Sequence, residues 1–264
     1  SMLWEYQKEL IRSQDNEIHS VNNLAPSFQE RKRFVSAFNG VHAALDKQDV
    51  EKLQQLGYSV WPNQRVQAVL MNSVPLIGAD KVWQLGYTGK GISIAIIDTG
   101  VDYTHPDLGG CFGQGCKVEG GYDIVNNDTD PMDDHGHGTH VASIAGGNGT
   151  LKGVAPGATI FAYKVLTNSG WGYWSWVIEG INRAIDPNQD GNFEDAAHVI
   201  SMSLGGSGDP DDPVSQSVDN AVKAGSVVTV AAGNSGSWYQ TITSPGTARE
   251  AITVGATDIF DRVT

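Results

Sequence analysis

The 264-residue sequence is poor in cysteine, in positive charge and in long apolar runs. Only 17 Lys and Arg stand against 30 Asp and Glu, so the formal net charge is −13. Nucleic acids and anionic membranes are bound through basic faces, so this balance argues against either as a partner. No apolar run reaches the ~18 residues of a membrane-spanning helix, and no signal peptide is visible in the sequence.

The two cysteines, Cys111 and Cys116, lie in the stretch GGCFGQGC. Their spacing differs from the Cys-x-x-Cys of metal and redox sites. The glycines between them allow a tight loop, so we expect a local disulfide, with two buried free thiols as the alternative. A disulfide favours an extracytoplasmic location, and we therefore expect a secreted, extracellular protein.

Glycine is abundant, at 32 residues, which suits a tightly turned α/β protein. After residue 75, near-continuous β-branched runs are typical of strands buried on both faces of a parallel sheet. These runs are GISIAIIDTG, ATIFAYKVL, HVISMSLGG, SVVTVAAGNSG and AITVGATD. Helical segments separate them at residues 137–146, 174–186 and 213–224. The alternation predicts a doubly wound, mainly parallel sheet.

The first 70 residues have a different pattern, which predicts a small α+β domain. LWEYQKELIRSQDNEIHS reads as an amphipathic helix, and two short apolar runs flank a turn at Asn39-Gly40. A second helix is expected to begin after Asp46 as its N-cap and to end at Gly57. The following stretch, YSVWPNQRVQAVL, is expected to be extended.

Polar residues follow several of the predicted strands, at the edge of the sheet where α/β proteins place their chemistry. Asp98 directly follows an apolar strand, and a buried carboxylate there needs a partner such as a histidine N–H. His137 opens a predicted helix, whose positive dipole end favours a neutral imidazole that can act as a base. Together with His135 and His140 it offers an alternative, a zinc site of three imidazoles, although no His-Glu-x-x-His motif occurs.

Three stretches, DTGVDYTHPDL, HGHGTHVA and AAGN, resemble signature blocks of the subtilisin-like serine proteases (subtilases), in that family's order. The resemblance covers essentially the whole chain. It implies that Asp98 orients the imidazole, that His137 is the general base and that Asn234 donates to the oxyanion. It makes His140 a helix-packing residue and His135 a loop residue.

The family's fourth block, Gly-Thr-Ser-Met-Ala, carries the nucleophilic serine and does not occur in this sequence. The resemblance therefore implies a serine endopeptidase with an Asp-His-Ser triad whose serine lies beyond residue 264. We expect residues 71–264 to be the N-terminal part of the peptidase domain, completed by a C-terminal part, and inactive without it. The alternative is an inactive fragment or pseudoenzyme that binds peptides or partners.

Residues 1–70 resemble the family's inhibitor-type propeptide, above all in AFNGVHAALDKQDVEKL. The resemblance implies a ferredoxin-like α+β domain, here without its first strand, that assists folding and blocks the cleft of a proenzyme. SVPLIGADKVW resembles the start of the mature enzyme, so cleavage is expected near residues 68–73.

The resemblance also implies protein or peptide substrates bound along two edges of the cleft. The residues expected there are Ser169, Gly170, Trp171, Ser203, Leu204, Gly205, Gly206, Ala232 and Gly233.

A calcium loop is suggested by the acidic stretch DPNQDGNFED, with a solvated acidic turn as the alternative. Its oxygen-bearing residues are Asp186, Asn188, Asp190, Glu194 and Asp195. The family's common calcium insertion after the catalytic histidine looks absent, so Asp107 is a doubtful ligand. No organic cofactor is expected.

Overall fold

The computed structural model describes residues 2–35, 38–63, 65–68, 77–236 and 239–256. At its centre lies a six-stranded sheet of order β11-β10-β8-β4-β6-β5, in which all neighbouring strands are parallel. The strands are β4 (Ser93–Asp98), β5 (Val118–Asp123), β6 (Thr159–Lys164), β8 (Val199–Met202), β10 (Val227–Ala231) and β11 (Ile252–Val254). The predicted parallel sheet is thus confirmed.

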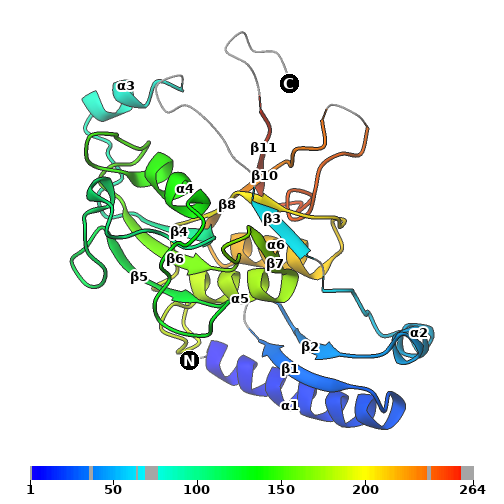
Figure 1. Cartoon of the computed structure of the whole chain (residues 1–264). Coiled ribbons are helices and arrows are strands. Elements are labelled where there is room, and N and C mark those ends of the chain that lie inside the picture. The colour runs from blue at the N-terminus through cyan, green and yellow to red at the C-terminus, as the bar shows by residue number, and fades with distance from the viewer. Residues whose placement is uncertain (1, 36–37, 64, 69–76, 237–238, 257–264) are drawn as a thin grey trace.

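Helices cover both faces of this sheet, as a doubly wound fold requires (Figure 1). Ile94 and Ile96 of β4 pack on the face that carries α4 (His137–Gly146). The intervening Ala95 and Ile97 pack on the opposite face with α5 (Trp174–Ile185) and α6 (Pro213–Lys223). Alternation of buried residues along one strand therefore places an apolar core on each side of the sheet.

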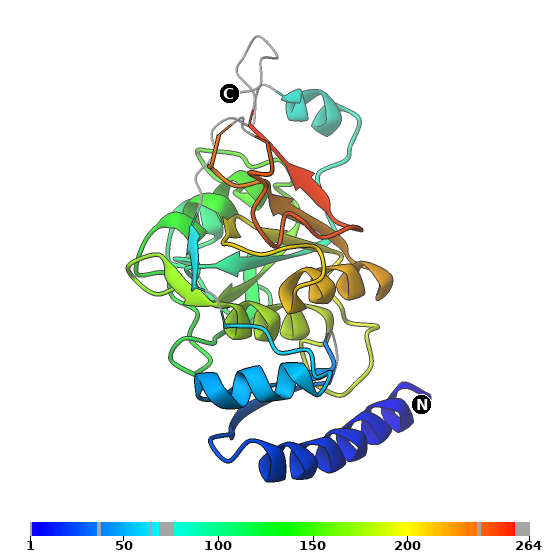
Figure 2. The same ribbon diagram turned by 90° about the vertical axis from the view of Figure 1, so that its right-hand side faces the viewer.

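Residues 2–63, which we call the N-terminal unit, form a smaller α+β body beside the sheet domain of residues 77–256 (Figure 2). Its elements are α1 (Met2–Leu24), β1 (Gln29–Phe34), β2 (Gly40–Ala44) and α2 (Lys47–Gln55). β1 and β2 form an antiparallel hairpin. The small core beneath it is built from Val21, Ala25 and Leu53.

The local signals in the N-terminal unit are mostly confirmed. Asp46 caps α2 by accepting a hydrogen bond from the Asp49 amide. β1, however, begins at the polar Gln29, earlier than the predicted apolar run. Phe34 is the one buried residue of this strand, so most of the strand gives no apolar signal in the sequence. The stretch expected to be extended, residues 58–70, contains the strand β3 (Arg65–Ala68), and its described residues 58–63 form no regular strand.

A short strand, β3 (Arg65–Ala68), lies antiparallel between β7 (Trp171–Tyr173) and β9 (Leu204–Gly205). Its backbone joins the N-terminal unit to two loops of the sheet domain that are far apart in sequence (Figure 1). The predicted cleavage region, residues 68–73, falls almost wholly outside the described residues.

Two further elements, α3 (Ala79–Gln84) and the 3₁₀ turn η2 (Pro106–Leu108), lie at the start of the sheet domain. Within the described ranges, no helix has both the length and the apolar character needed to cross a membrane.

The expected disulfide between Cys111 and Cys116 is present. It closes a loop with a sequence separation of 5. In the chain-entropy picture, closing so short a loop stabilises the folded state by about 2 kcal/mol. Replacing both cysteines by serine should lower the free energy of unfolding by that amount in denaturant titrations. A double variant as stable as the parent protein would contradict this prediction.

Candidate active site

Asp98 and His137 form a buried hydrogen-bonded pair at the carboxyl edge of the sheet. Asp98 is the last residue of β4 and His137 the first of α4. The His137 Nδ1 atom lies 2.7 Å from Asp98 Oδ1, and both side chains are 1% exposed. An acceptor on Nδ1 selects the tautomer in which Nδ1 carries the proton, so Nε2 carries the lone pair that can act as a base.

The same oxygen of Asp98 also accepts a hydrogen bond from the Thr99 amide at 2.7 Å. Burial raises the pKa of Asp98, while the hydrogen bond from His137 opposes that rise. Among the described residues, the other carboxylate oxygen, Oδ2, is buried and has no hydrogen-bond partner. The carboxylate therefore depends on the imidazole for stabilisation, which ties the two residues together electrostatically.

The Asp98–His137 contact is possible because the first turn of α4 packs closely against the turn that follows Asp98. A Cβ atom at Gly138 would lie 2.0 Å from the Gly100 carbonyl oxygen. Gly100 itself has φ +103°, a conformation that side chains rarely adopt. The glycines in DTG and HGHG thus let two backbone segments meet at a distance that any side chain would prevent.

Asp133 holds the loop that leads into α4. Its carboxylate accepts hydrogen bonds from the amides of His135, Gly136 and Thr139, and from the hydroxyls of Thr99 and Thr139. Burial alone would raise the pKa of Asp133, but these hydrogen bonds outweigh it and the pKa lies below its ordinary value. Hydrogen bonds from Leu151 and Thr150 likewise lower the pKa of Asp107.

These lowered pKa values predict acid lability. A carboxyl group whose pKa is depressed by folding contributes stability above its ordinary value, here 3.8, and loses it as the pH falls through the folded value. Melting temperatures should therefore fall steeply below about pH 4. Asp133→Asn should lower the melting temperature at pH 7 and flatten the acid limb, and an acid limb as steep as the parent's would contradict this assignment.

Asn234, the expected oxyanion donor, lies three residues beyond the end of β10 at the same edge of the sheet. Its side chain is exposed. The backbone before it is closely packed, since a Cβ at Gly233, where φ is +103°, would lie 2.5 Å from Thr243 Oγ1. Ala232 and Gly233, the two residues before Asn234, are half-buried. Their role in substrate binding stays a prediction.

The two expected substrate edges lie on either side of β3. Gln67 of β3 pairs with Trp171 on one side and with Gly205 on the other, and Ala68 pairs with Leu204. Ser169 and Gly170 lead into β7, and Ser203 and Gly206 flank β9. Both edges therefore present backbone to an extended segment, which here belongs to the chain itself. Binding of a separate substrate to them is not tested.

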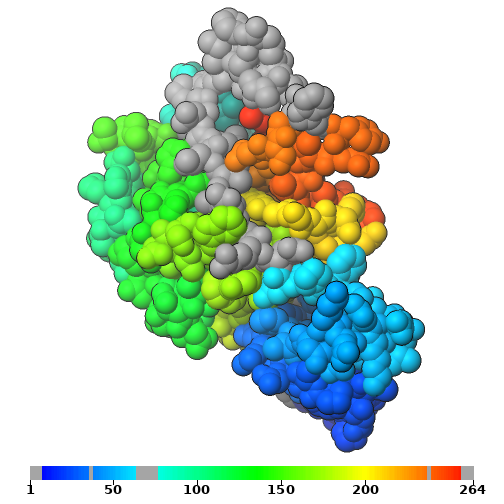
Figure 3. Space-filling view, turned by 45° about the vertical axis from the view of Figure 1, so that its right-hand side comes forward, coloured from blue at the N-terminus to red at the C-terminus, as the bar shows by residue number. Residues whose placement is uncertain are grey.

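The N-terminal unit also contacts the first turns of α5. The Asn63 side chain accepts a hydrogen bond from the Ser175 amide and donates one to the Ser175 hydroxyl, each at 2.8 Å. It caps a helix whose own N-cap, Tyr173, supplies no side-chain bond. Lys32 of β1 forms an ion pair with Glu179 at 3.0 Å. Figure 3 shows the unit, blue to cyan, lying against the sheet domain.

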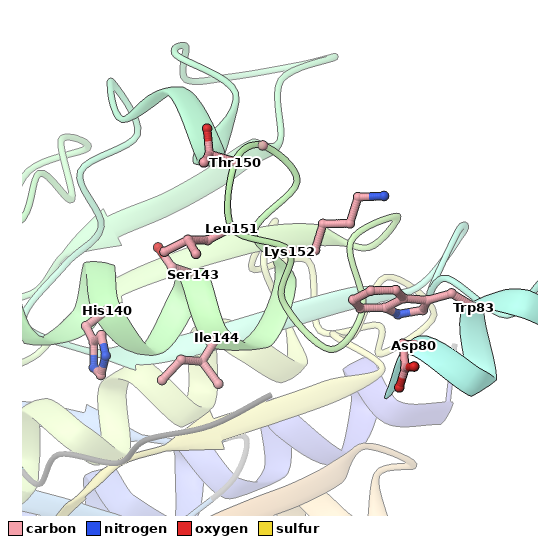
Figure 4. A pocket seen from close by; sticks show the side chains of 9 residues that line it. Asp80, Trp83, His140, Ser143, Ile144, Thr150, Leu151 and Lys152 are labelled. Carbon is pink, nitrogen blue, oxygen red and sulfur yellow. The ribbon is translucent and has the colours of Figure 1, made fainter. Parts of the chain in front are cut away.

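The three histidines of HGHGTH do not form a metal site. His137 contacts Asp98 through Nδ1, and the centre of its ring lies 6.4 Å from that of the exposed His135. His140 instead lines a pocket of about 520 Å³ with Trp83 and Lys152 (Figure 4). Across the described part of the chain, no three His, Cys, Asp or Glu side chains are arranged to hold a metal ion.

The expected calcium residues lie in the loop that follows α5, and calcium binding to them stays a prediction. Both oxygens of Asp186 accept backbone hydrogen bonds, from the amides of Asp190 and Gly191 at 3.1 Å. Asn188 accepts another from Asp190. Glu194 and Asp195 are exposed. Burial, with the like charges of Asp195 and Asp190, raises the pKa of Asp186.

Three residues of this region were not predicted from the sequence. Asp133 and Asn63 act through hydrogen bonds to backbone amides, which leave no pattern in the sequence. Lys164 was detectable, because it is the one charged residue in the apolar run ATIFAYKVL. A charge in a strand buried on both faces must find partners inside the fold.

Fold and site together define a doubly wound α/β protein with a buried Asp–His pair at the carboxyl edge of its sheet. The model of the subtilase family matches residues 89–261. The chain belongs to the subtilase family.

Three similar proteins come from bacteria. The chain is similar to the minor extracellular protease Vpr of Bacillus subtilis (strain 168), with 49% identity over 198 residues, 71% of this chain and 23% of that protein. It is similar to the serine protease AprX of the same organism, with 38% identity over 248 residues, 87% of this chain and 54% of AprX. Thermitase of Thermoactinomyces vulgaris is 43% identical over 189 residues, 70% of this chain and 61% of thermitase. The chain thus spans from a quarter to three fifths of these relatives.

Proposed function

We propose that the protein is a serine endopeptidase of the subtilisin type, made as a proenzyme, in which His137 is the general base. The observation that carries this proposal is the buried 2.7 Å contact between Asp98 and His137 in a chain of the subtilase family. His137 Nε2 would remove the proton of a serine that lies outside these 264 residues. Asp98 would stabilise the imidazolium, and Asn234 would donate to the oxyanion.

A serine-directed fluorophosphonate probe tests this proposal on the longer protein that contains the missing block. We expect hydrolysis of casein, its loss on labelling, and a labelled serine beyond residue 264. The 264-residue chain should show neither labelling nor hydrolysis. If the longer protein is neither labelled nor active, the second candidate takes its place, a pseudoenzyme that binds peptides between β7 and β9. Its basis is the pairing of β3 with both edges, which shows that they can hold an extended segment.

Residues 1–70 are proposed to act as the inhibitory propeptide. β3 occupies the space between the two substrate edges, and the Asn63 cap and the Lys32–Glu179 ion pair hold the N-terminal unit to α5. Added in trans, this segment should inhibit the mature enzyme, and Asn63→Ala should weaken inhibition about fivefold, since a helix cap contributes about 1 kcal/mol. Equal inhibition by both forms would contradict the role of Asn63.

A groove beside β2 supports the proposal that a further strand belongs to this segment. A groove of about 960 Å³ runs between β2 and residues 57–63, with α1 and α2 as its floor. Gln14 lines it, is 6% exposed, and its Oε1 atom lacks a hydrogen-bond partner among the described residues. A strand paired with β2 here should slow amide hydrogen exchange in β2 relative to the 264-residue chain; unchanged exchange in a longer protein would argue against it.

Secretion and calcium binding are two further parts of the proposal. The disulfide supports an oxidising, extracellular location, and the name of the relative Vpr includes the word extracellular. The like charges that raise the pKa of Asp186 would be offset by a cation bound at residues 186–195. Calcium should then raise the melting temperature relative to chelator, and Asp190→Asn should reduce that difference; identical melting in both conditions would remove calcium from the proposal.

A further inference from the structure

Lys164, the last residue of β6, is 1% exposed. Across the parallel strand pair its neighbour is Asp98, the last residue of β4. Burial of an ammonium group is unfavourable unless its charge and its three N–H donors are matched by partners. An apolar side chain would close the sheet at this point without that cost. The partners of Lys164 therefore indicate what the buried cation does.

All three donors of the Lys164 ammonium group are used. Its Nζ atom donates to the carbonyl oxygens of Thr99 at 2.6 Å and Leu166 at 3.1 Å, and to Asp134 Oδ1 at 2.5 Å. The Asp134 side chain is 50% exposed, so the ion pair lies at the border between the sheet and solvent. The cation is held by two backbone carbonyls inside the fold and one carboxylate at its rim.

These partners belong to the two segments that carry the Asp–His pair. Thr99 directly follows Asp98, and Asp134 precedes His137 by three residues. One ammonium group thus connects the end of β4 to the loop that leads into α4. The Thr99 hydroxyl makes a second connection, because it accepts a hydrogen bond from the Gly138 amide at 2.8 Å.

We propose that Lys164 is a positioning residue of the active site: its buried ammonium group holds the Thr99 turn and the Asp134 loop in the one arrangement that keeps His137 Nδ1 in hydrogen-bond contact with Asp98. The inference rests on the proposed function, since it assigns a role toward the same pair. The hydrogen-bond partners of Lys164 are Thr99, Leu166 and Asp134, so it acts on the pair through the segments on both sides of it. A displacement of the pair by about 1 Å can lower turnover about 100-fold.

The test compares Lys164→Met with Lys117→Met. Methionine keeps most of the side-chain volume and removes the charge. Lys117 is a matched control, because its Nζ atom also donates to two backbone carbonyls, those of Pro156 and Ala158, away from the pair. The readout in the 264-residue chain is the far-downfield proton NMR resonance of the His137–Asp98 hydrogen bond. In the longer enzyme it is kcat and KM for a peptide substrate.

We expect Lys164→Met to abolish the downfield resonance and to lower kcat about 10- to 100-fold with little change in KM. Lys117→Met should keep both the resonance and kcat, even if its melting temperature falls. Should Lys164→Met fail to fold, Asp134→Asn removes the rim partner alone and should broaden the resonance and lower kcat. Asp211→Asn is its control, because it removes the carboxylate of an exposed ion pair with Arg249.

Two results would overturn the inference. One is a folded Lys164→Met or Asp134→Asn variant with a parental resonance and parental kcat. The other is equal loss in Lys164→Met and Lys117→Met, which would show a general effect on stability. If the parent chain itself lacks the resonance, the Asp98–His137 pair fails, and with it the proposed function; this outcome is distinct from failure of Lys164 alone.

Discussion

His137→Ala should abolish both peptide hydrolysis and self-processing in the longer protein. The imidazole is the only base in contact with Asp98 among the described residues, and its Nε2 atom is the proton acceptor of the proposed mechanism. Removal of the general base of subtilisin, a member of this family, lowers kcat about 10⁶-fold, and we expect a loss of the same order. Hydrolysis of a chromogenic peptide and gel analysis of processing measure the two effects.

His140→Ala is the matched control, three residues further along α4. His140 is half-buried, and its side chain lines the same pocket as Ser143 and Ile144 (Figure 4). Its loss should lower the melting temperature and leave kcat within a few-fold of the parent enzyme. Equal loss of activity in the two variants, without destabilisation, would contradict the assignment of His137 as the base.

Gly138→Ala should be strongly destabilising, although alanine is normally the better helix former by about 1 kcal/mol. Its Cβ atom would lie 2.0 Å from the Gly100 carbonyl oxygen, which is backbone and cannot rotate away. The start of α4 must move off the turn, at a cost of about 3 kcal/mol, and this movement pulls His137 from Asp98. Denaturant titration measures the first effect and peptide hydrolysis the second.

Gly146→Ala, in the last turn of the same helix, is the control. It makes the same substitution in α4 without the backbone clash expected at Gly138. There the nearest atom to an added Cβ is a side-chain carbon of Ile160 at 3.4 Å, an ordinary contact. This variant should be as stable as the parent or slightly more stable. A Gly138→Ala variant with parental stability and activity would show that the close approach of α4 to the Asp98 turn is not required.

The elements that sequence patterns predicted are those whose signal is local. β4, β6, β8 and β10 are apolar on both faces, and α6 has Asp212 as its N-cap followed by Pro213. The strand-end rule placed Asp98 at the carboxyl edge of the sheet, and the resemblance to the subtilases implied its pairing with His137. β5 escaped, since its sequence VEGGYD holds two glycines and few apolar residues.

Contacts between distant segments could not be predicted in the same way. The pairing of β3 with β7 and β9 depends on the placement of three short segments, each with too few residues to carry a pattern. The Asn63 cap on α5 joins positions 112 residues apart. Lys164 is detectable in the sequence as a charge in an apolar run. Its partners Thr99 and Asp134 are not, because they depend on how the loop before α4 packs against Thr99.

The most direct measurement is the proton spectrum of the 264-residue chain with ¹⁵N-labelled histidine. A buried His137 that donates Nδ1–H to Asp98 should give one far-downfield resonance bonded to Nδ1, present in the parent chain and absent from Asp98→Asn. A folded parent chain without that resonance, or with the same resonance in Asp98→Asn, would show that the two side chains do not meet and that this edge of the sheet holds no general base.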